Sequence, residues 1–163
     1  IHRVFQLDDI LARDIMTQRT VVFELTAESQ LGAVAERLYA ASVSRIPLYE
    51  EDLDDVVGVV HIRDVLAALA KGNSGKVLRD YADEVSFVPD TARANMLLSL
   101  FQKNREHLFV VVDEHGGMAG IVKLEDVLEQ MVGEIVHEHD RDLDLRVKAR
   151  MLEEQRRTRR KGG

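Results

Sequence analysis

The 163-residue chain contains no cysteine. This absence excludes a disulfide framework, a zinc site built on thiolates and a cysteine nucleophile. The chain also lacks a glycine loop of the kind that cradles phosphates, and it has no serine, histidine and aspartate arrangement suited to nucleophilic catalysis. No apolar run reaches the roughly 18 residues that mark a membrane-spanning helix. We therefore expect neither enzymatic activity nor a membrane-spanning segment in this chain.

The net charge of −7 is distributed unevenly. Residues 141–163 contain nine Lys or Arg and four Asp or Glu, whereas the other 140 residues contain thirteen basic and 25 acidic residues. An acidic body is not typical of nucleic-acid-binding domains, so no nucleic-acid partner is expected. We predict a charged, basic tail over residues 137–163 that either contacts anionic lipid or extends into solvent. The acidic loop 50–55 lacks the ligand spacing of a calcium loop, and no metal site is predicted.

One short motif occurs twice. Gly58-Val59-Val60-His61-Ile62-Arg63-Asp64 returns 62 positions later as Gly120-Ile121-Val122-Lys123-Leu124-Glu125-Asp126. In both copies a β-branched run typical of a strand gives way to apolar residues spaced three and four apart, which is typical of a helix. We expect the same offset without a gap from residue 14 to residue 70. The sequence therefore predicts a duplicated unit of about sixty residues.

Each predicted unit has the order strand, helix, strand, strand, helix. We place a lead-in helix at residues 1–13, the first unit at 14–72, the second unit at 76–136 and the tail at 137–163. The first strand is expected at 21–25 and the last helix of the second unit at 124–132. A unit of this size buries too little apolar surface to be stable alone. We therefore expect an α+β (α/β) fold in which the two units pack their sheets together with pseudo-two-fold symmetry.

Several stretches resemble a known family. They are Asp14-Ile15-Met16-Thr17, the segments 44–50, 105–107 and 112–120, and the stretch 124–129 followed by Gly133-Glu134-Ile135. Together with the repeat, they resemble the paired CBS domains (a Bateman module) of the CorC/HlyC family, which comprises hemolysin C-like magnesium/cobalt efflux proteins related to the cyclin M transporters. The resemblance covers residues 4–140. It implies the cytosolic regulatory module of a membrane protein, soluble as a fragment and placed at the cytoplasmic face of the cell membrane, which binds an adenosine nucleotide and dimerises.

The resemblance implies two nucleotide pockets related by the duplication. In the first, Asp126 would accept hydrogen bonds from the ribose hydroxyls, and Arg45 would bind phosphate. This pocket comprises Thr17, Arg45, Ile46, Pro47, Ile121, Val122, Lys123 and Asp126. The second and weaker pocket comprises His107, Leu108 and Asp64. The alternative roles are helix capping for the two aspartates and Thr17, a surface salt bridge for Arg45, and a solvent-exposed strand end for Lys123.

We expect the first pocket to be the preferred one. In the second pocket, the offset of 62 puts His107 in the place of Arg45, with Glu106 beside it, and Arg79 in the place of Thr17. We predict ATP or AMP in the first pocket, with Mg²⁺ held through the phosphates.

The family usually has Thr or Ser three residues before each aspartate, whereas this chain has His61 and Lys123. This departure favours an alternative function, a dimerisation scaffold with a degenerate pocket that binds no nucleotide. In either case a homodimer is expected, closed through the last helix of each unit with two-fold symmetry. The expected contact residues are Leu66, Leu69, Leu128, Met131 and Val132. The transmembrane domain of the parent protein is the remaining expected partner.

Overall fold

The computed structural model describes residues 8–162, except for the side chains of Glu134, His137 and Glu138. Most of the predicted lead-in helix over residues 1–13 therefore lies outside the described part. Within the described residues, α2 (Ala12–Ile15) is a single helical turn. Its Asp14 carboxylate accepts a hydrogen bond from the Leu11 N–H at 2.9 Å, which satisfies one of the free donors at the helix start.

The first unit has the predicted order of elements. They are β2 (Leu25–Thr26), α3 (Leu31–Ala40), β3 (Arg45–Tyr49), β4 (Val56–His61) and α4 (Ile62–Ala70). The three strands form one sheet in the order β2-β3-β4, in which β2 is parallel to β3 and β3 is antiparallel to β4. The expected strand at 21–25 is shorter than predicted, because residues Arg19–Val21 form the 3₁₀ turn η1 and only the last residue of that range enters β2.

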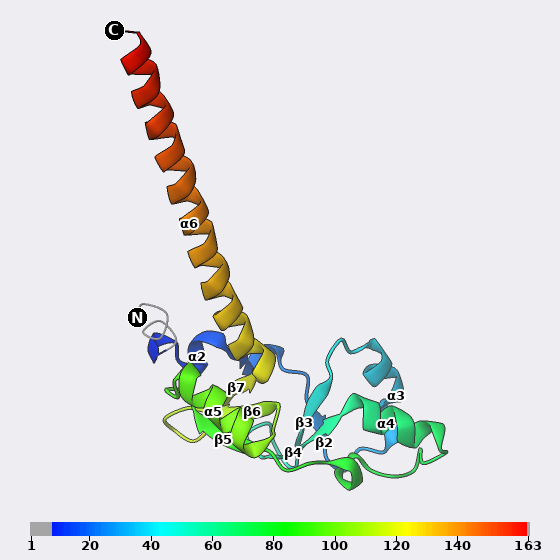
Figure 1. Ribbon diagram of the computed structural model, residues 1–163. Helices are drawn as coiled ribbons and strands as arrows, with labels where there is room; N and C mark the ends of the chain where they lie inside the picture. Colours follow the sequence, from blue (N-terminus) through cyan, green and yellow to red (C-terminus); the bar gives the residue numbers. More distant parts are fainter. Residues whose placement is uncertain (1–7, 163) are drawn as a thin grey trace.

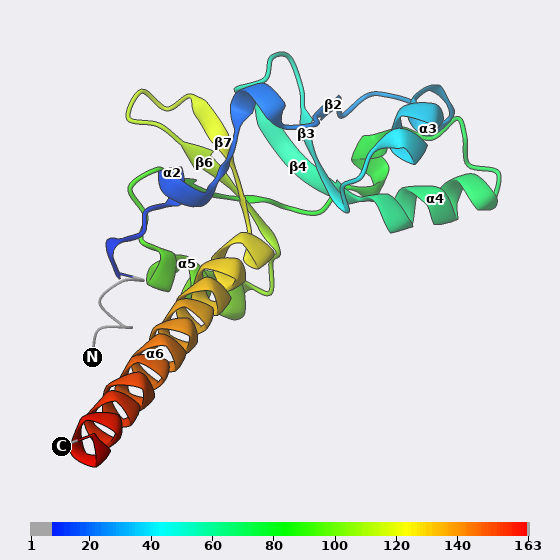
Figure 2. The same ribbon diagram turned by 90° about the horizontal axis from the view of Figure 1, so that it is seen from above.

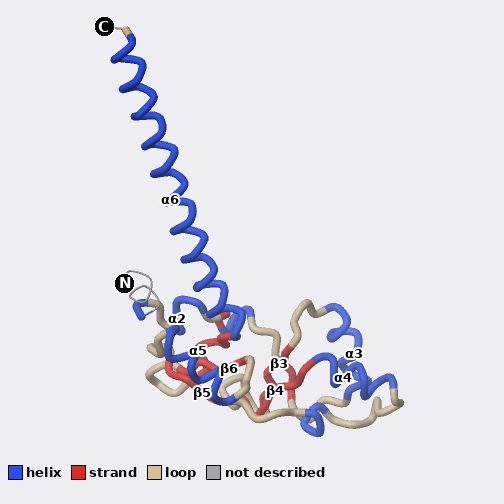
Figure 3. The backbone as a smooth tube through the Cα atoms, viewed as in Figure 1, coloured by secondary structure: helices blue, strands red, loops and turns tan. Residues whose placement is uncertain are grey.

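The second unit repeats this arrangement after the 3₁₀ turn η2 (Leu78–Tyr81). Its elements are β5 (Ser86–Pro89), α5 (Ala94–Asn104), β6 (Leu108–Val112), β7 (Met118–Lys123) and α6 (Leu124–Lys161). β5 is parallel to β6, and β6 is antiparallel to β7. The short strand β1 (Thr17–Gln18) adds to the free edge of β7, so the sheet order is β1-β7-β6-β5. Figure 3 shows the strands in red and the helices in blue. The predicted pair of β-α-β-β-α units is therefore confirmed.

The two sheets lie in the middle of the body and the helices lie outside them (Figure 2). Alternate strand residues point to opposite faces of a sheet, so each sheet contributes to two apolar clusters. One face of each sheet packs on the helices of its own unit, where Phe101 and Phe109 stack with ring centroids 4.0 Å apart. The other faces meet between the units through Val56, Val59, Leu108, Val110, Met118 and Ile121. This shared cluster makes the two units one body.

The predicted offset of 62 without a gap is wrong for part of the repeat. Leu25 pairs with Leu48, and Val88 pairs with Val111. The strands β2 and β3 of the first unit therefore correspond to β5 and β6 of the second unit with an offset of 63 positions. Val60 and Val122, which face Ile46 and Phe109, are related by 62. The second hairpin loop is thus one residue shorter than the first. An alignment of the two copies without gaps does not reveal this difference in loop length, because offsets of 62 and of 63 positions both align apolar residues with apolar residues.

The glycine that opens each motif copy allows a close approach of the chain. A Cβ atom on Gly120 would lie far inside van der Waals contact with the Thr17 carbonyl oxygen. A Cβ atom on Gly58 would lie 3.0 Å from the Asp83 carbonyl oxygen. The segment that leads into each unit therefore crosses directly over the third strand of the other unit. A side chain at either glycine would push this segment away.

Helix α6 is longer than predicted. The sequence analysis placed the end of the closing helix at Val132 and a separate charged tail over residues 137–163, but the helix continues without a break for 38 residues. It leaves the body after its first turns and projects alone (Figure 1). Gly133 weakens a helix without breaking it, and the following Glu, Arg and Leu residues are strong helix formers. Acidic residues in the first turn and basic residues in the last complement the helix dipole.

Candidate functional site: the cleft between the repeats

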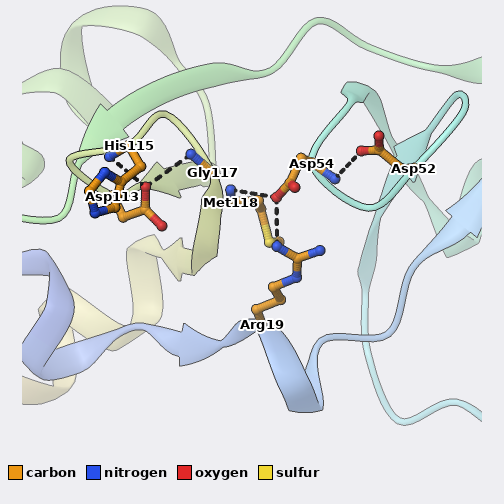
Figure 4. A network of polar contacts seen from close by, with 7 residues as sticks. All are labelled: Arg19, Asp52, Asp54, Asp113, His115, Gly117 and Met118. Atoms are coloured by element: carbon orange, nitrogen blue, oxygen red, sulfur yellow. Dashed lines mark hydrogen bonds and ion pairs between the residues drawn. The ribbon is translucent and has the colours of Figure 1, made fainter.

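The acidic loop 50–55 of the first unit binds to the second unit. The Asp54 carboxylate accepts a hydrogen bond from the Met118 N–H at 2.9 Å and one from the Arg19 guanidinium at 2.6 Å (Figure 4). In the adjoining hairpin, Asp113 accepts hydrogen bonds from the N–H groups of His115 and Gly117. Among the described residues, no cluster of acidic or histidine side chains has the arrangement of a metal site. We therefore assign this loop a structural role.

Glu24 lies next to this contact. Burial raises the pKa of Glu24, the Arg19 charge opposes this shift, and the Asp54 charge adds to it. One carboxylate oxygen, Oε2, is buried and has no hydrogen-bond partner. A buried carboxylate without a full set of donors is costly to ionise. Glu24 is therefore a destabilising group in its charged form.

A cavity of about 350 Å³ lies between the two units. Its wall in the first unit is formed by the start of β3, the end of β4 and the start of α4. Its wall in the second unit is formed by the segment before β5 and the start of β6. Its lining contains Arg45, Val59, Val60, His61, Arg63, Asp64, Asp83, Glu84, Arg105, Glu106, His107 and Leu108. The structure thus brings Arg45 of the first predicted pocket together with all three residues of the second. Thr17, Lys123 and Asp126 do not line this cavity.

The charges of the cavity are mixed. Burial lowers the pKa of His61, and the positive charges of Arg45 and Arg63 lower it further, with Asp64 opposing and His107 adding a small contribution. His61 therefore lies in a cationic field. Acidic residues also face the cavity, and the buried oxygen Oε2 of Glu106 has no hydrogen-bond partner.

The two motif aspartates have different surroundings. The Asp126 carboxylate accepts a hydrogen bond from the Lys123 N–H at 2.9 Å through Oδ2, so it does cap α6, as the alternative interpretation supposed. Burial raises the pKa of Asp126, although this hydrogen bond and the Lys123 charge lower it. Asp64 is exposed, and its nearest recorded cation is Arg63 at 3.8 Å. The corresponding cap of α4 is provided by His61, whose Nδ1 accepts from the Arg63 N–H.

The strand pairing corrects the comparison of the two pockets. Arg45 faces His61 across the first hairpin, and Leu108 faces Lys123 across the second, so the residue in the place of Arg45 is Leu108, not His107. Thr17 pairs with Ile121, and Asp83 pairs with Val59, so the residue in the place of Thr17 is Asp83, not Arg79. The sequence analysis misassigned both, because both assignments depended on the ungapped offset.

The Arg79 side chain interacts with the first unit and not with the second pocket. Its guanidinium forms ion pairs with Glu28 and Glu50 of the first unit, and these interactions raise the pKa of Arg79. It therefore supplies no positive charge to the second pocket. Arg45, by contrast, has no carboxylate within ion-pair distance among the residues that the structure describes.

Several apolar residues of the first predicted pocket are interior. Ile46 is completely buried in the core of the first unit and Val122 in that of the second. Pro47 is also buried, and Ile121 lies in the cluster between the units. These side chains therefore hold the strands that carry Arg45 and Lys123. Sequence reasoning missed Arg63 and Arg105 in the cavity, and no periodicity distinguishes them from other surface arginines.

Two stretches, residues 12–71 and 78–133, match the model of the CBS domain family. The chain belongs to the CBS domain family. It contains a pair of CBS domains, which confirms the family predicted from the repeated motif. CBS domains are regulatory modules and not catalytic ones.

The CBS pair has relatives among curated proteins. It is 43% identical over 150 residues to a UPF0053 protein of Synechocystis, a match that covers 92% of this chain and 43% of that protein. It is 30% identical over 142 residues to the magnesium and cobalt efflux protein CorC of Pasteurella multocida, covering 87% of this chain and 47% of that protein. The chain therefore spans less than half the length of each of these two relatives.

Solved structures show the same fold. The CBS domain of a bacterial CNNM/CorC family Mg²⁺ transporter in complex with ATP matches with a TM-score of 0.76 and 33% identity, covering 81% of this chain and 94% of that one. A CBS-domain pair from Klebsiella pneumoniae with bound AMP matches with a TM-score of 0.68 and 28% identity, covering 76% of this chain and 99% of that one. The CBS pair is thus of the CorC type. Across residues 8–162, no helix is both long and apolar enough to cross a bilayer.

Proposed function

We propose that this CBS pair is the regulatory module of a CorC-type magnesium/cobalt transporter and that it binds ATP or AMP in the Arg45/Asp126 pocket. One observation carries the choice of pocket. The pseudo-symmetric positions hold Arg45 and Thr17 on one side, but Leu108 and Asp83 on the other. At the equivalent positions the second repeat thus offers an apolar side chain and a carboxylate instead of a cation and a hydroxyl, although the cavity beside Asp64 is also lined by Arg45, Arg63 and Arg105.

The proposed roles follow from donor and acceptor chemistry. The Arg45 guanidinium, which has no carboxylate partner among the described residues, binds phosphate through its planar set of donors. Asp126 uses Oδ2 for the helix cap, which leaves Oδ1 to accept from a ribose hydroxyl. Thr17 offers a hydroxyl and Lys123 a second cation, now held 3.8 Å from Glu125. Mg²⁺ would enter with the phosphates, because that ion favours phosphate oxygens and water.

The relatives support the wider context of the proposal. A UPF0053 protein and a magnesium and cobalt efflux protein contain a region similar to this chain. We propose that the parent protein is a membrane transporter and that the CBS pair lies at the cytoplasmic face of the membrane. We also propose a homodimer closed through α4 and the start of α6. Of the predicted contact residues, Leu128 and Val132 are exposed, whereas Leu66, Leu69 and Met131 are half-buried.

The alternative function is a dimerisation scaffold that binds no nucleotide. The presence of His61 and Lys123 at the positions where the family usually has Thr or Ser favours it. Thermal unfolding of the chain with ATP or AMP, each with and without Mg²⁺, separates the two functions. A nucleotide at 100 times its dissociation constant should stabilise the chain by about 2.7 kcal/mol. If neither nucleotide shifts the transition at millimolar concentration, the scaffold is the correct interpretation.

Titration calorimetry with three variants tests the choice of pocket. Arg45→Ala should weaken binding at least about tenfold, because one charge-assisted bond to phosphate contributes roughly 1.5–3 kcal/mol. Asp126→Asn keeps an acceptor for the Lys123 N–H and should still weaken binding at least about tenfold by losing the charged acceptor for ribose. Asp64→Asn is the matched control and should bind as the parent chain does. Loss of binding in Asp64→Asn but not in Asp126→Asn would move the nucleotide to the 350 Å³ cavity.

A further inference from the structure

The distal part of α6 has an apolar face with nothing packed against it. Every described side chain from Ile135 to Lys161 is exposed. Five large apolar residues, here called the distal stripe, are between 44% and 59% exposed; they are Val132, Val136, Leu143, Val147 and Met151. Figure 1 shows that this part of the helix stands clear of the body. A contiguous exposed apolar surface of this kind marks an interaction site.

The spacing of the distal stripe keeps it on one side of the helix. Val132 and Leu143 are eleven positions apart, as are Val136 and Val147. Eleven residues make just over three complete turns, so the stripe is nearly straight and suits a partner helix of similar length. Helices gain most of their stability from the packing of such a face. A partner on the stripe would therefore stabilise a helix that is otherwise held only at its start.

The charge of α6 is divided into two halves. Residues 124–144 contain eight acidic residues and one basic residue, whereas residues 146–161 contain eight basic residues and two acidic ones. Two such helices side by side in parallel would place like charges together. In an antiparallel pair, the acidic half of each helix would lie along the basic half of the other. Charge complementarity of this kind selects both the partner and its orientation.

We propose that the distal stripe binds the same stripe of a second copy of this chain in an antiparallel helix pair. Four positions of the stripe support this partner, because Val132, Val136, Val147 and Met151 are symmetric about the point between residues 141 and 142. Antiparallel pairing centred there sets Val132 opposite Met151 of the partner subunit. It also sets Val136 opposite Val147 of the partner subunit. In the same register the basic residues between positions 146 and 150 lie opposite positions 133–137 of the partner subunit, within its acidic half.

This interface shares only Val132 with the homodimer proposed above through α4 and the start of α6. A two-fold axis near residue 141 places the two CBS bodies at opposite ends of the paired helices, so that α4 of one copy does not meet α4 of the other. The helix pair also does not depend on nucleotide binding. The two interfaces can therefore fail separately.

Charge exchange tests the helix pair in the full chain. One variant carries Arg146→Glu, Lys148→Glu and Arg150→Glu, all at exposed positions. The other carries Glu134→Lys and Glu138→Lys, which lie beside the positions opposite Arg146, Lys148 and Arg150 in this register. By sedimentation, each variant alone should self-associate at least about tenfold more weakly than the parent chain, and an equimolar mixture should recover association to within about threefold. Circular dichroism checks that both variants retain their helix content and their thermal transition.

Single cysteines test the orientation, since the chain has no cysteine of its own. Val136→Cys and Val147→Cys should each form few disulfide dimers alone, but a mixture of the two should form a mixed disulfide. Dimers of Val136→Cys alone, with none in the mixture, would indicate a parallel pair and overturn the proposal. So would unchanged self-association in both charge variants. A monomeric parent chain that sediments with phosphatidylserine vesicles but not with phosphatidylcholine vesicles would identify a membrane surface as the partner and also overturn it.

Discussion

Replacing glycine by alanine at three positions should give three different results, because the surroundings of the three glycines differ. At Gly120, the added Cβ overlaps the Thr17 carbonyl oxygen and also lies 3.1 Å from Met16 Sδ. The overlapping atom belongs to the backbone of β1, so relief requires β1 to move away from β7. The substitution should therefore break the Thr17–Ile121 pairing and displace a residue of the proposed nucleotide pocket.

The expected magnitudes follow from this geometry. Overpacking of a well-packed site costs roughly 1–3 kcal/mol, and Gly120→Ala should reach the upper end because a backbone carbonyl cannot rotate away. Gly58→Ala places its Cβ 3.0 Å from the Asp83 carbonyl oxygen, a tight contact that a small shift can relieve, and should cost about 1 kcal/mol. Gly133→Ala has no atom within 4 Å of the new Cβ and should stabilise α6 by about 0.5–1 kcal/mol.

Urea and thermal unfolding followed by circular dichroism measure the series. For a chain of this length, 1 kcal/mol corresponds to roughly 2–4 °C in Tm, so Gly120→Ala should lower the Tm by about 6–12 °C while Gly133→Ala leaves it equal or higher. Calorimetry should also show weaker ATP binding by Gly120→Ala than by Gly58→Ala. Equal costs at Gly120 and Gly133 would refute the close approach of β1 to β7. A large loss at Gly120 with unchanged ATP binding would refute only the role of Thr17.

Three further predictions concern charged groups. Asp54→Ala removes the acceptor for Arg19 and the Met118 N–H and should cost about 2 kcal/mol in urea unfolding; Asp55→Ala in the same loop is the control and should cost nothing measurable. Burial raises the pKa of Glu24, so its charged form destabilises the fold and stability is lost as pH rises from below 4.5 through the raised pKa. Glu24→Gln should therefore be more stable than the parent chain at pH 7 and equal to it near pH 4; a variant less stable at pH 7 would contradict this. Finally, burial and then the positive charges of Arg45 and Arg63 lower the pKa of His61, and phosphate bound at Arg45 should offset the contribution of these charges. In an NMR titration, the pKa of His61 should then be higher with ATP than without it, and ATP should bind more tightly at pH 6 than at pH 8. An unchanged pKa of His61 would place the phosphate elsewhere.

The sequence alone was sufficient for the fold class and the family. The strand-to-helix change after each motif glycine depends on local periodicity, and α4 and α6 begin where that periodicity changes, directly after β4 and β7. The alternation of apolar residues in the hairpin strands likewise predicts buried faces, because side chains of a strand point to opposite sides. Local patterns of this kind do not depend on distant contacts, so they can be read without the structure.

The composition of the two pockets was decided only by the tertiary structure. Which residue corresponds to Arg45 depends on the register of two hairpins, and a loop shortened by one residue changes the answer from His107 to Leu108. Which residue corresponds to Thr17 depends on where a non-adjacent segment pairs with a strand edge. Register between distant segments is fixed by packing of whole faces.

The same distinction explains Asp54 and α6. Asp54 reaches Met118 across 64 positions, and nothing in the loop 50–55 indicates that contact beforehand. In α6, the charged residues of the distal half were evident from the sequence, but no sequence pattern indicated that the closing helix and the tail are one element. The helix persists because no residue between 133 and 161 is a proline and no neighbouring element terminates it. Local propensity thus determined that the tail is helical, and the absence of tertiary contacts along it in the described part of the chain left its apolar stripe open to a partner.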